Sequence, residues 1–235
     1  MKKNAILLPG LDYQVESLFK HLNSNPQKIL VAGSGAFYAA SRIAAHFNTP
    51  ADMIVEDYQS LLEARLVSEN NPSVNIKMMS FENTDYGDSE FDLIYAQASV
   101  STPDRNRIIK EFKRILKPGG YLYAGEIVHL SDKYPAFIKD IYENSYLNPL
   151  RIDEMRKYYS ERRFKIIYEE DLSHTLKDYY KEIDKRLDES RTELEPSEKS
   201  YYKKIINRIK HESHAYLNLG GNKHIGYYLF LLQKD

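Results

Sequence analysis

The feature that most constrains this chain is a glycine turn between an apolar run and a helical pattern. Residues 29–32 form a short apolar run typical of a buried parallel strand, and Gly33-Ser34-Gly35 follows directly. Residues 36–47 then carry apolar side chains at helical spacing. Glycine lets the backbone approach a ligand closely, and a helix start offers free N–H groups. The pattern favours a site for an adenosine-containing ligand, although a tight strand-to-helix turn without a ligand has similar sequence features.

Composition restricts the class of protein. The chain has 235 residues, a net charge of -1 and no cysteine. A balanced charge gives no global basic field for nucleic acid or an anionic membrane, so we expect neither as a partner. The absence of cysteine excludes disulfides, a thiolate nucleophile and Cys-ligated zinc, and the histidines show no metal-like set, so no metal is expected. The apolar stretch near the start is too short for a signal peptide and no run reaches transmembrane length, which predicts a cytoplasmic protein.

Strand-like runs alternate with helical patterns along the first half of the chain. Besides the glycine unit, strands are predicted over 51–56, 74–79, 91–96 and 121–128, and helices over 11–22, 58–66 and from Pro103-Asp104 to a stop at Gly119-Gly120. Such alternation predicts an α/β fold with a doubly wound parallel sheet and helices on both faces.

The second half is more helical. Helices are predicted over 135–146 and 152–159, a sixth strand over 163–168, and a seventh over 224–232. Residues 172–218 form a helical insertion between strands six and seven, with a hinge at 192–197 and a helix over 201–216. We therefore expect one domain over 1–235, with the insertion acting as a cap.

The middle of the chain resembles the class I S-adenosylmethionine-dependent methyltransferases. The FDLIYAQ block at 91–97 matches the fourth strand of that family, and the RILKPGG block at 114–120 is characteristic of its small-molecule branch. The resemblance covers 27–128, and 225–232 fits the antiparallel seventh strand more loosely. It implies a Rossmann-like sheet of seven strands, S-adenosylmethionine as cofactor, and methyl transfer to a small-molecule N, O or C nucleophile.

The resemblance also implies which residues bind the cofactor's methionine and ribose parts. The turn of Gly33, Ser34 and Gly35 would lie against the methionine part. Glu56, at the end of the second strand, would accept hydrogen bonds from the ribose hydroxyls, because a carboxylate offers two acceptor oxygens to a diol. Asp57 is the alternative ribose ligand if the strand extends one residue further. Glu56 could also be an ordinary solvated carboxylate at a strand end.

Four further residues lie where the family places its site. Ser80 and Phe81 follow the third strand, and they either contact adenine or pack as an ordinary loop. Gln97, just past the fourth strand, would lie beside the sulfonium. His129 follows the fifth strand, where a histidine is either a general base or a surface residue.

Two departures from the family pattern keep alternatives open. The family has an acid two positions before its first glycine, where this chain has Val31, and a third glycine where this chain has Phe37. A non-catalytic or repurposed cofactor-binding relative is therefore one alternative. A nicotinamide-dependent oxidoreductase is another, but its fingerprint requires glycine at position 38, which is Tyr38.

Tyrosine is abundant, with 20 residues, and five of them lie on the insertion. These five either line an acceptor pocket, where they could enclose a cationic amine, or pack between helices: Tyr179, Tyr180, Tyr201, Tyr202 and Tyr216.

Overall fold

The computed structural model describes residues 6–68, 71–193 and 196–235, with side chains omitted from 190 to 201. A seven-stranded sheet runs through the centre in the order β3-β2-β1-β4-β5-β7-β6. The strands are β1 (Ile29–Ala32), β2 (Ala51–Val55), β3 (Val74–Met78), β4 (Phe91–Gln97), β5 (Leu116–His129), β6 (Phe164–Asp171) and β7 (Ile225–Lys234). In the described sheet β7 alone runs opposite to the other strands, so its pairings with β5 and β6 are antiparallel and the remaining pairings are parallel. This confirms the predicted doubly wound, mostly parallel fold.

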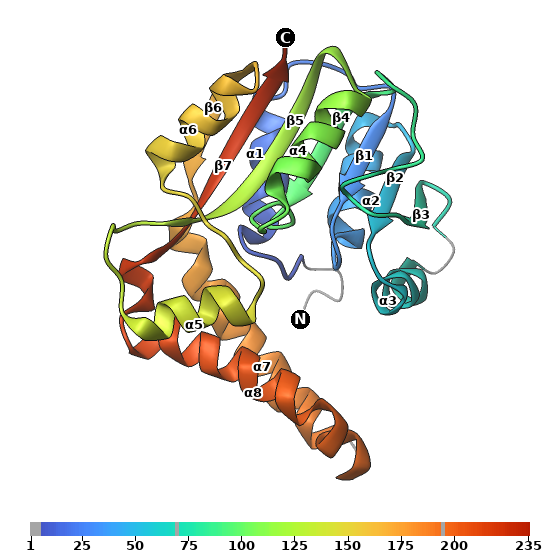
Figure 1. Cartoon of the computed structure of the whole chain (residues 1–235). Coiled ribbons are helices and arrows are strands. Elements are labelled where there is room, and N and C mark those ends of the chain that lie inside the picture. Colours follow the sequence, from blue (N-terminus) through green and yellow to red (C-terminus); the bar gives the residue numbers. More distant parts are fainter. Residues whose placement is uncertain (1–5, 69–70, 194–195) are drawn as a thin grey trace.

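Helices lie on both faces of this sheet (Figure 1). They are α1 (Leu11–His21), α2 (Phe37–Phe47), α3 (Tyr58–Ser68), α4 (Arg105–Ile115), α5 (Ala136–Asn144), α6 (Ile152–Glu161), α7 (Leu176–Glu193) and α8 (Pro196–Asn218), with short 3-10 helices η1 (Ser173–Thr175) and η2 (Gly221–Lys223). Ile29 and Val31 of β1 join one core cluster with α1 and α2. Leu30 joins the other, with α4 and α6. The strand is buried on both faces, which explains why its sequence is continuously apolar.

The Lys-Pro-Gly-Gly block corrects one predicted boundary. The sequence predicts a helix that runs to Gly119, whereas α4 ends at Ile115 and β5 begins at Leu116. Pro118 explains the early end, because helices usually end at or before the residue that precedes a proline. Leu116 is already extended, with φ -70° and ψ 138°, and pairs with Phe91 at the start of β4.

Between β6 and β7 the chain forms η1, α7, α8 and η2. α7 and α8 pack side by side as a helical pair that projects from the sheet (Figure 1). The predicted hinge at 192–197 is shorter than expected, because α7 continues to Glu193 and α8 already begins at Pro196; residues 194–195 lie outside the described part. Proline is favoured in the first turn of a helix, so Pro196 starts this helix and does not separate it from a later one.

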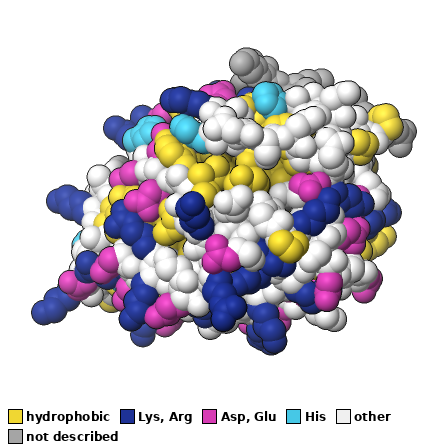
Figure 2. Space-filling view, turned by 90° about the horizontal axis from the view of Figure 1, so that it is seen from above, with side chains coloured by type: hydrophobic (Ala, Val, Ile, Leu, Met, Phe, Trp, Pro, Cys, Tyr) yellow, Lys and Arg dark blue, Asp and Glu magenta, His cyan; other side chains and the backbone are white. Residues whose placement is uncertain are grey.

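The outer surface mixes charges of both signs. Seen from above Figure 1, acidic and basic side chains alternate around a central group of hydrophobic ones (Figure 2). In the described part of the chain, no helix combines the length and the hydropathy needed to span a bilayer.

Candidate functional site

The glycine turn has the backbone geometry that its sequence predicts. Gly33 and Gly35 both have positive φ, +145° and +74°, a region that favours glycine. A Cβ atom at Gly33 would lie 3.3 Å from the Cβ of Ser99, so the turn packs closely against the loop after β4. Ser34 and Gly35 are exposed. The turn therefore presents open backbone at the carboxyl end of β1, where ligands of such sheets bind.

The two departures from the family pattern leave this turn open. Phe37 is 5% exposed and belongs to the core cluster that also holds Val31. An added Cβ at Gly35 would meet only Leu8, at 3.6 Å, so the Phe37 ring does not cover that glycine. The α2 N-terminus has no side-chain cap, which leaves its first N–H groups available to a ligand.

The structure assigns different partners to Glu56 and Asp57. β2 ends at Val55, and Asp57 accepts hydrogen bonds from the Ser60 N–H (2.8 Å) and the Ser60 hydroxyl (2.7 Å) at the start of α3. These bonds lower the pKa of Asp57. Glu56 is exposed, and its Oε1 accepts the Phe81 N–H at 2.9 Å. Its Oε2 has no hydrogen-bond partner in the described residues, so Glu56 is the better of the two for holding a diol.

The adenine-side residues divide between surface and core. Ser80 is exposed, and its hydroxyl accepts the Glu82 N–H at 3.3 Å. The Phe81 ring is only 4% exposed and lies 6.4 Å from the Phe112 ring, centroid to centroid. The geometry therefore favours loop packing for the Phe81 ring, whereas the Phe81 N–H fixes the position of Glu56.

Gln97 holds the N-terminal segment against the sheet. Its Nε2 donates to the carbonyl oxygens of Pro9 and Leu11, both at 2.9 Å, and its Oε1 accepts the Tyr95 hydroxyl at 2.8 Å. Gln97 is 2% exposed. Its amide nitrogen and oxygen both bond inside the protein, so Gln97 positions the segment that carries Leu8. No local sequence signal pairs Gln97 with residues so far away in the chain.

His129 is the last residue of β5, and its ring contacts the loop after that strand and the carboxylate of Glu154 in α6. Its Nδ1 lies 3.1 Å from the Ser131 carbonyl oxygen, and its Nε2 lies 4.0 Å from a Glu154 carboxylate oxygen. The ring of Tyr134 packs edge-on against it. These contacts fit a structural histidine better than a general base.

A cavity of about 250 Å³ lies at the carboxyl ends of β4 and β5, beneath α5, α7 and α8. Apolar side chains and backbone make most of its wall, and the lining residues are Leu8, Pro9, Ala98, Ile127, Ile141, Ser145, Leu147, Tyr179, Tyr180, Glu212 and Ile225. We name it the cap pocket. Leu8 both lines this pocket and lies against Gly35, so the pocket and the glycine turn are neighbours.

Glu212 is the one ionisable carboxylate among the residues that line the cap pocket. Its Oε1 accepts the Tyr180 hydroxyl and its Oε2 accepts the Ser145 hydroxyl, both at 2.8 Å. Burial raises the pKa of Tyr179, and the neighbouring Glu212 raises it further. Tyr216 stacks on Tyr180 with 4.5 Å between ring centroids, so it supports the wall from behind.

Sequence reasoning found part of this wall. Of the five tyrosines on the insertion, Tyr179 and Tyr180 line the cap pocket, Tyr202 does not, and the side chain of Tyr201 lies outside the described residues. Glu212 was missed, because only the packing of α8 against α5 and α7 identifies it among many charged residues of its helix.

Sequence comparisons agree with this architecture. Residues 30–124 match a family model described as a methyltransferase domain. A sarcosine/dimethylglycine N-methyltransferase of Halorhodospira halochloris is 30% identical over 146 residues, which cover 61% of this chain and 51% of that protein. The chain thus spans about half the length of the curated relative it matches.

Solved structures share the fold. Phosphoethanolamine N-methyltransferase 2 of Haemonchus contortus, in complex with S-adenosyl-L-methionine, superposes with a TM-score of 0.77 at 15% identity, covering 97% of this chain and 53% of that one. The geranyl diphosphate C-methyltransferase of Streptomyces coelicolor gives a TM-score of 0.71 at 14% identity, covering 95% and 77%. The [4+2]-cyclase SpnF gives 0.76 at 17% identity, covering 95% and 80%.

The sheet order and the glycine turn are those of a Rossmann-like α/β fold. The helical pair α7 and α8 lies over the carboxyl ends of its strands β4 and β5. Residues 30–124 match the methyltransferase-domain family, and the fold over nearly the whole chain is shared with solved methyltransferases.

Proposed function

We propose that the chain transfers a methyl group from S-adenosylmethionine to a small-molecule acceptor held in the cap pocket, and that the acceptor nucleophile is an amine. The observation that carries this proposal is the position of Leu8 between the glycine turn and the cap pocket. A donor on the turn and an acceptor in the pocket would then be neighbours across a single side chain. Methyl transfer requires the two reacting atoms to come into contact, so the Leu8 side chain would have to move aside when both ligands are bound.

The residues at the turn fit the cofactor. Gly33 and Gly35 offer close backbone approach, the uncapped start of α2 offers N–H groups, and Glu56 offers a free oxygen to the ribose diol. When bound, the cofactor supplies an intrinsically reactive methyl group on a positively charged sulfur. The protein's part is to align the acceptor and exclude water, which an apolar pocket wall does.

The lining of the cap pocket supports an amine. An anionic acceptor would be repelled by Glu212, whereas an amine can donate to a carboxylate and lie against the faces of Tyr179 and Tyr180. The volume of about 250 Å³ lies below the usual range of drug-sized sites, about 300–1,000 Å³, which favours a small acceptor. The relatives named for sarcosine, dimethylglycine and phosphoethanolamine also act on amines by their names. Residues 172–218 would thus act as the cap that selects the substrate.

Binding without methyl transfer is a second candidate function. Val31 is fully buried in the position where the family has an acid, so nothing charged at that position orients the methionine part. A cyclase with the same fold shows that the fold alone does not require methyl transfer.

One assay separates these functions. The purified chain is incubated with methyl-deuterated S-adenosylmethionine and a panel of small amines, alcohols and activated carbon acids, and products are identified by mass spectrometry. We expect a labelled N-methyl product from at least one amine. Stabilisation by S-adenosylhomocysteine in a thermal shift assay without any product would support binding alone, and stabilisation by NAD alone would exclude both.

A further inference from the structure

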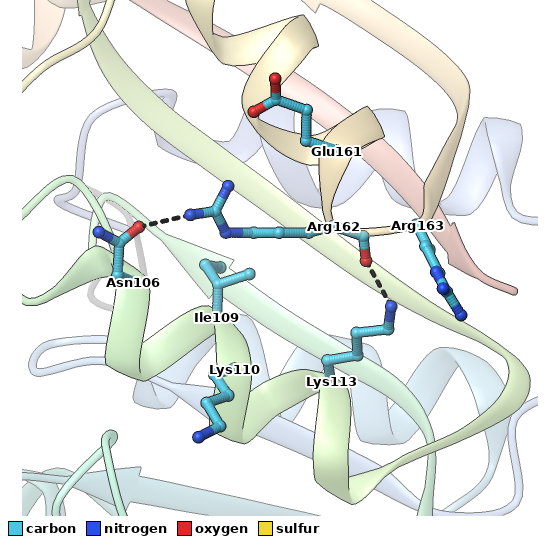
Figure 3. Close-up of a pocket in the computed structure, with 7 residues that line it drawn as sticks. All are labelled: Asn106, Ile109, Lys110, Lys113, Glu161, Arg162 and Arg163. Atoms are coloured by element: carbon cyan, nitrogen blue, oxygen red, sulfur yellow. Dashed lines mark hydrogen bonds between the residues drawn. The ribbon is translucent and has the colours of Figure 1, made fainter.

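A second, larger cavity lies on the flank of the molecule, between α4 and the turn that joins α6 to β6 (Figure 3). Its volume is about 550 Å³, and it shares no lining residue with the cap pocket. It lies beside the last turn of α4, where Lys113 precedes the start of β5, whereas the cap pocket touches Ile127 near the other end of that strand. We name this cavity the flank groove.

Positive charge dominates the flank groove. Four of its seven lining residues are basic: Lys110, Lys113, Arg162 and Arg163. None of the four has a carboxylate within ion-pair distance in the described part of the chain, although many arginines elsewhere are paired. The one acidic lining residue, Glu161, pairs instead with Lys157 at 3.8 Å, and Figure 3 shows its carboxylate pointing away from Arg162.

Two of the four cations, Arg162 and Lys113, are held in place before any ligand arrives. The Arg162 guanidinium lies 3.6 Å from the centroid of the Tyr158 ring and donates to Asn106 Oδ1 at 2.8 Å. Lys113 Nζ donates to the Arg162 carbonyl oxygen, and in Figure 3 its tip lies between that oxygen and the Arg163 side chain. Fixed side chains lose little conformational entropy on binding, which favours affinity.

Like charges act on one another in this groove. Burial lowers the pKa of Lys113, and Arg163 and Lys234 lower it further, whereas Asp235 acts in the opposite direction. An anion placed among these groups would relieve the repulsion and would be bound by charge-assisted hydrogen bonds, which are about twice as strong as neutral ones.

We propose that the flank groove binds a small organic molecule that carries a diphosphate or triphosphate group. Several cations suit the several charges of an oligophosphate, among which Lys113 acts as a point charge. The Arg162 fork already donates to Asn106 Oδ1 and to the Tyr158 carbonyl oxygen (3.0 Å), so it offers a phosphate its positive charge and its remaining N–H groups. The volume of about 550 Å³ is that of a small-molecule site. The site is separate from the proposed methyl transfer, so either proposal can fail alone.

Calorimetric titration of the full chain with pyrophosphate, at physiological salt, tests this proposal. We expect saturable binding of one pyrophosphate per chain, and binding roughly tenfold weaker in the double variant Lys113→Gln/Arg163→Gly. Arg163 has a positive φ of 57°, so glycine suits its backbone and this variant should fold. Hydrogen exchange with pyrophosphate present should show protection at 106–113 and 161–165.

The matched control is Lys139→Gln/Lys223→Gln, which removes two exposed positive charges from α5 and η2. Its affinity for pyrophosphate should equal that of the wild type. The proposal is overturned if pyrophosphate does not bind at millimolar concentration, if both double variants weaken binding equally, or if a single-stranded RNA binds the groove and pyrophosphate does not.

Discussion

The two halves of the proposed site are built in different ways. The cofactor half comes from residues close together in sequence, namely the turn of Gly33 to Gly35 and Glu56 one strand further on. The acceptor half is assembled from the N-terminal segment, the ends of β4 and β5, the start of β7, and three helices. The first half depends on backbone conformation and the second on side chains brought together by the fold. A substitution in one half should therefore change either cofactor affinity or acceptor KM and leave the other unchanged. Residues that connect the two halves are the exception.

The largest effect is expected at Gln97, which joins the halves. Gln97→Ala would leave the carbonyl oxygens of Pro9 and Leu11 without their buried donor, at a cost of about 1–3 kcal/mol for each unsatisfied group. Stability should fall in urea unfolding, cofactor affinity should fall in a titration with S-adenosylhomocysteine, and the acceptor KM should rise. Gln27→Ala, which removes an exposed amide, is the control and should leave all three unchanged. Normal stability in Gln97→Ala would contradict the role of this residue as a clamp.

Glu56→Ala should affect the cofactor half alone. Loss of a charged acceptor reduces S-adenosylhomocysteine binding by about 1.5–3 kcal/mol, or more than tenfold. The matched variant Asp57→Ala should instead remove the cap of α3 and lower stability by about 0.5–2 kcal/mol, with cofactor affinity retained. The reverse pattern would assign the ribose to Asp57.

Glu212→Gln should affect the acceptor half alone. The amide keeps the shape of the cap pocket but removes its charge, so the acceptor KM should rise about tenfold, which corresponds to a loss of about 1.4 kcal/mol. Titration with S-adenosylhomocysteine should give the wild-type affinity. Glu182→Gln, in the half-buried pair that Glu182 forms with Arg186 on α7 outside the cap pocket, is the control. An unchanged KM for Glu212→Gln would remove the carboxylate from acceptor recognition.

The smallest effect concerns the loop after β3, which carries Ser80 and Phe81. Burial raises the pKa of Glu111, but hydrogen bonds from Arg114 and Thr84 outweigh it, and the net pKa lies below the ordinary value of 4.5. A carboxyl group whose pKa is lower in the folded state than in the unfolded state stabilises the fold at any pH above its unfolded-state pKa. This stabilisation is lost as the pH falls through the folded-state pKa. The urea midpoint of the wild type should therefore fall more between pH 7 and pH 4 than that of Glu111→Gln. Equal falls of the urea midpoint in the wild type and in Glu111→Gln would contradict the lowered pKa of Glu111.

The difference between a locally built cofactor half and an acceptor half assembled from distant segments also explains what the sequence could predict. The strand-turn-helix of β1 and α2, and the position of Glu56 directly after β2, follow from local pattern, because neighbouring residues determine them. The order of the strands depends on distant parts of the chain, and it follows from the family resemblance. The early end of α4 was missed, although Pro118 signals it. The clamp by Gln97 and the carboxylate of Glu212 could not be predicted, because their partners lie far away in sequence.

Titration of the wild-type chain with S-adenosylhomocysteine by calorimetry tests the central claim most directly. The account predicts saturable heat for one ligand per chain, because an open glycine turn, a free helix start and an unshared carboxylate oxygen meet at one edge of the sheet. A flat titration at millimolar ligand would contradict it.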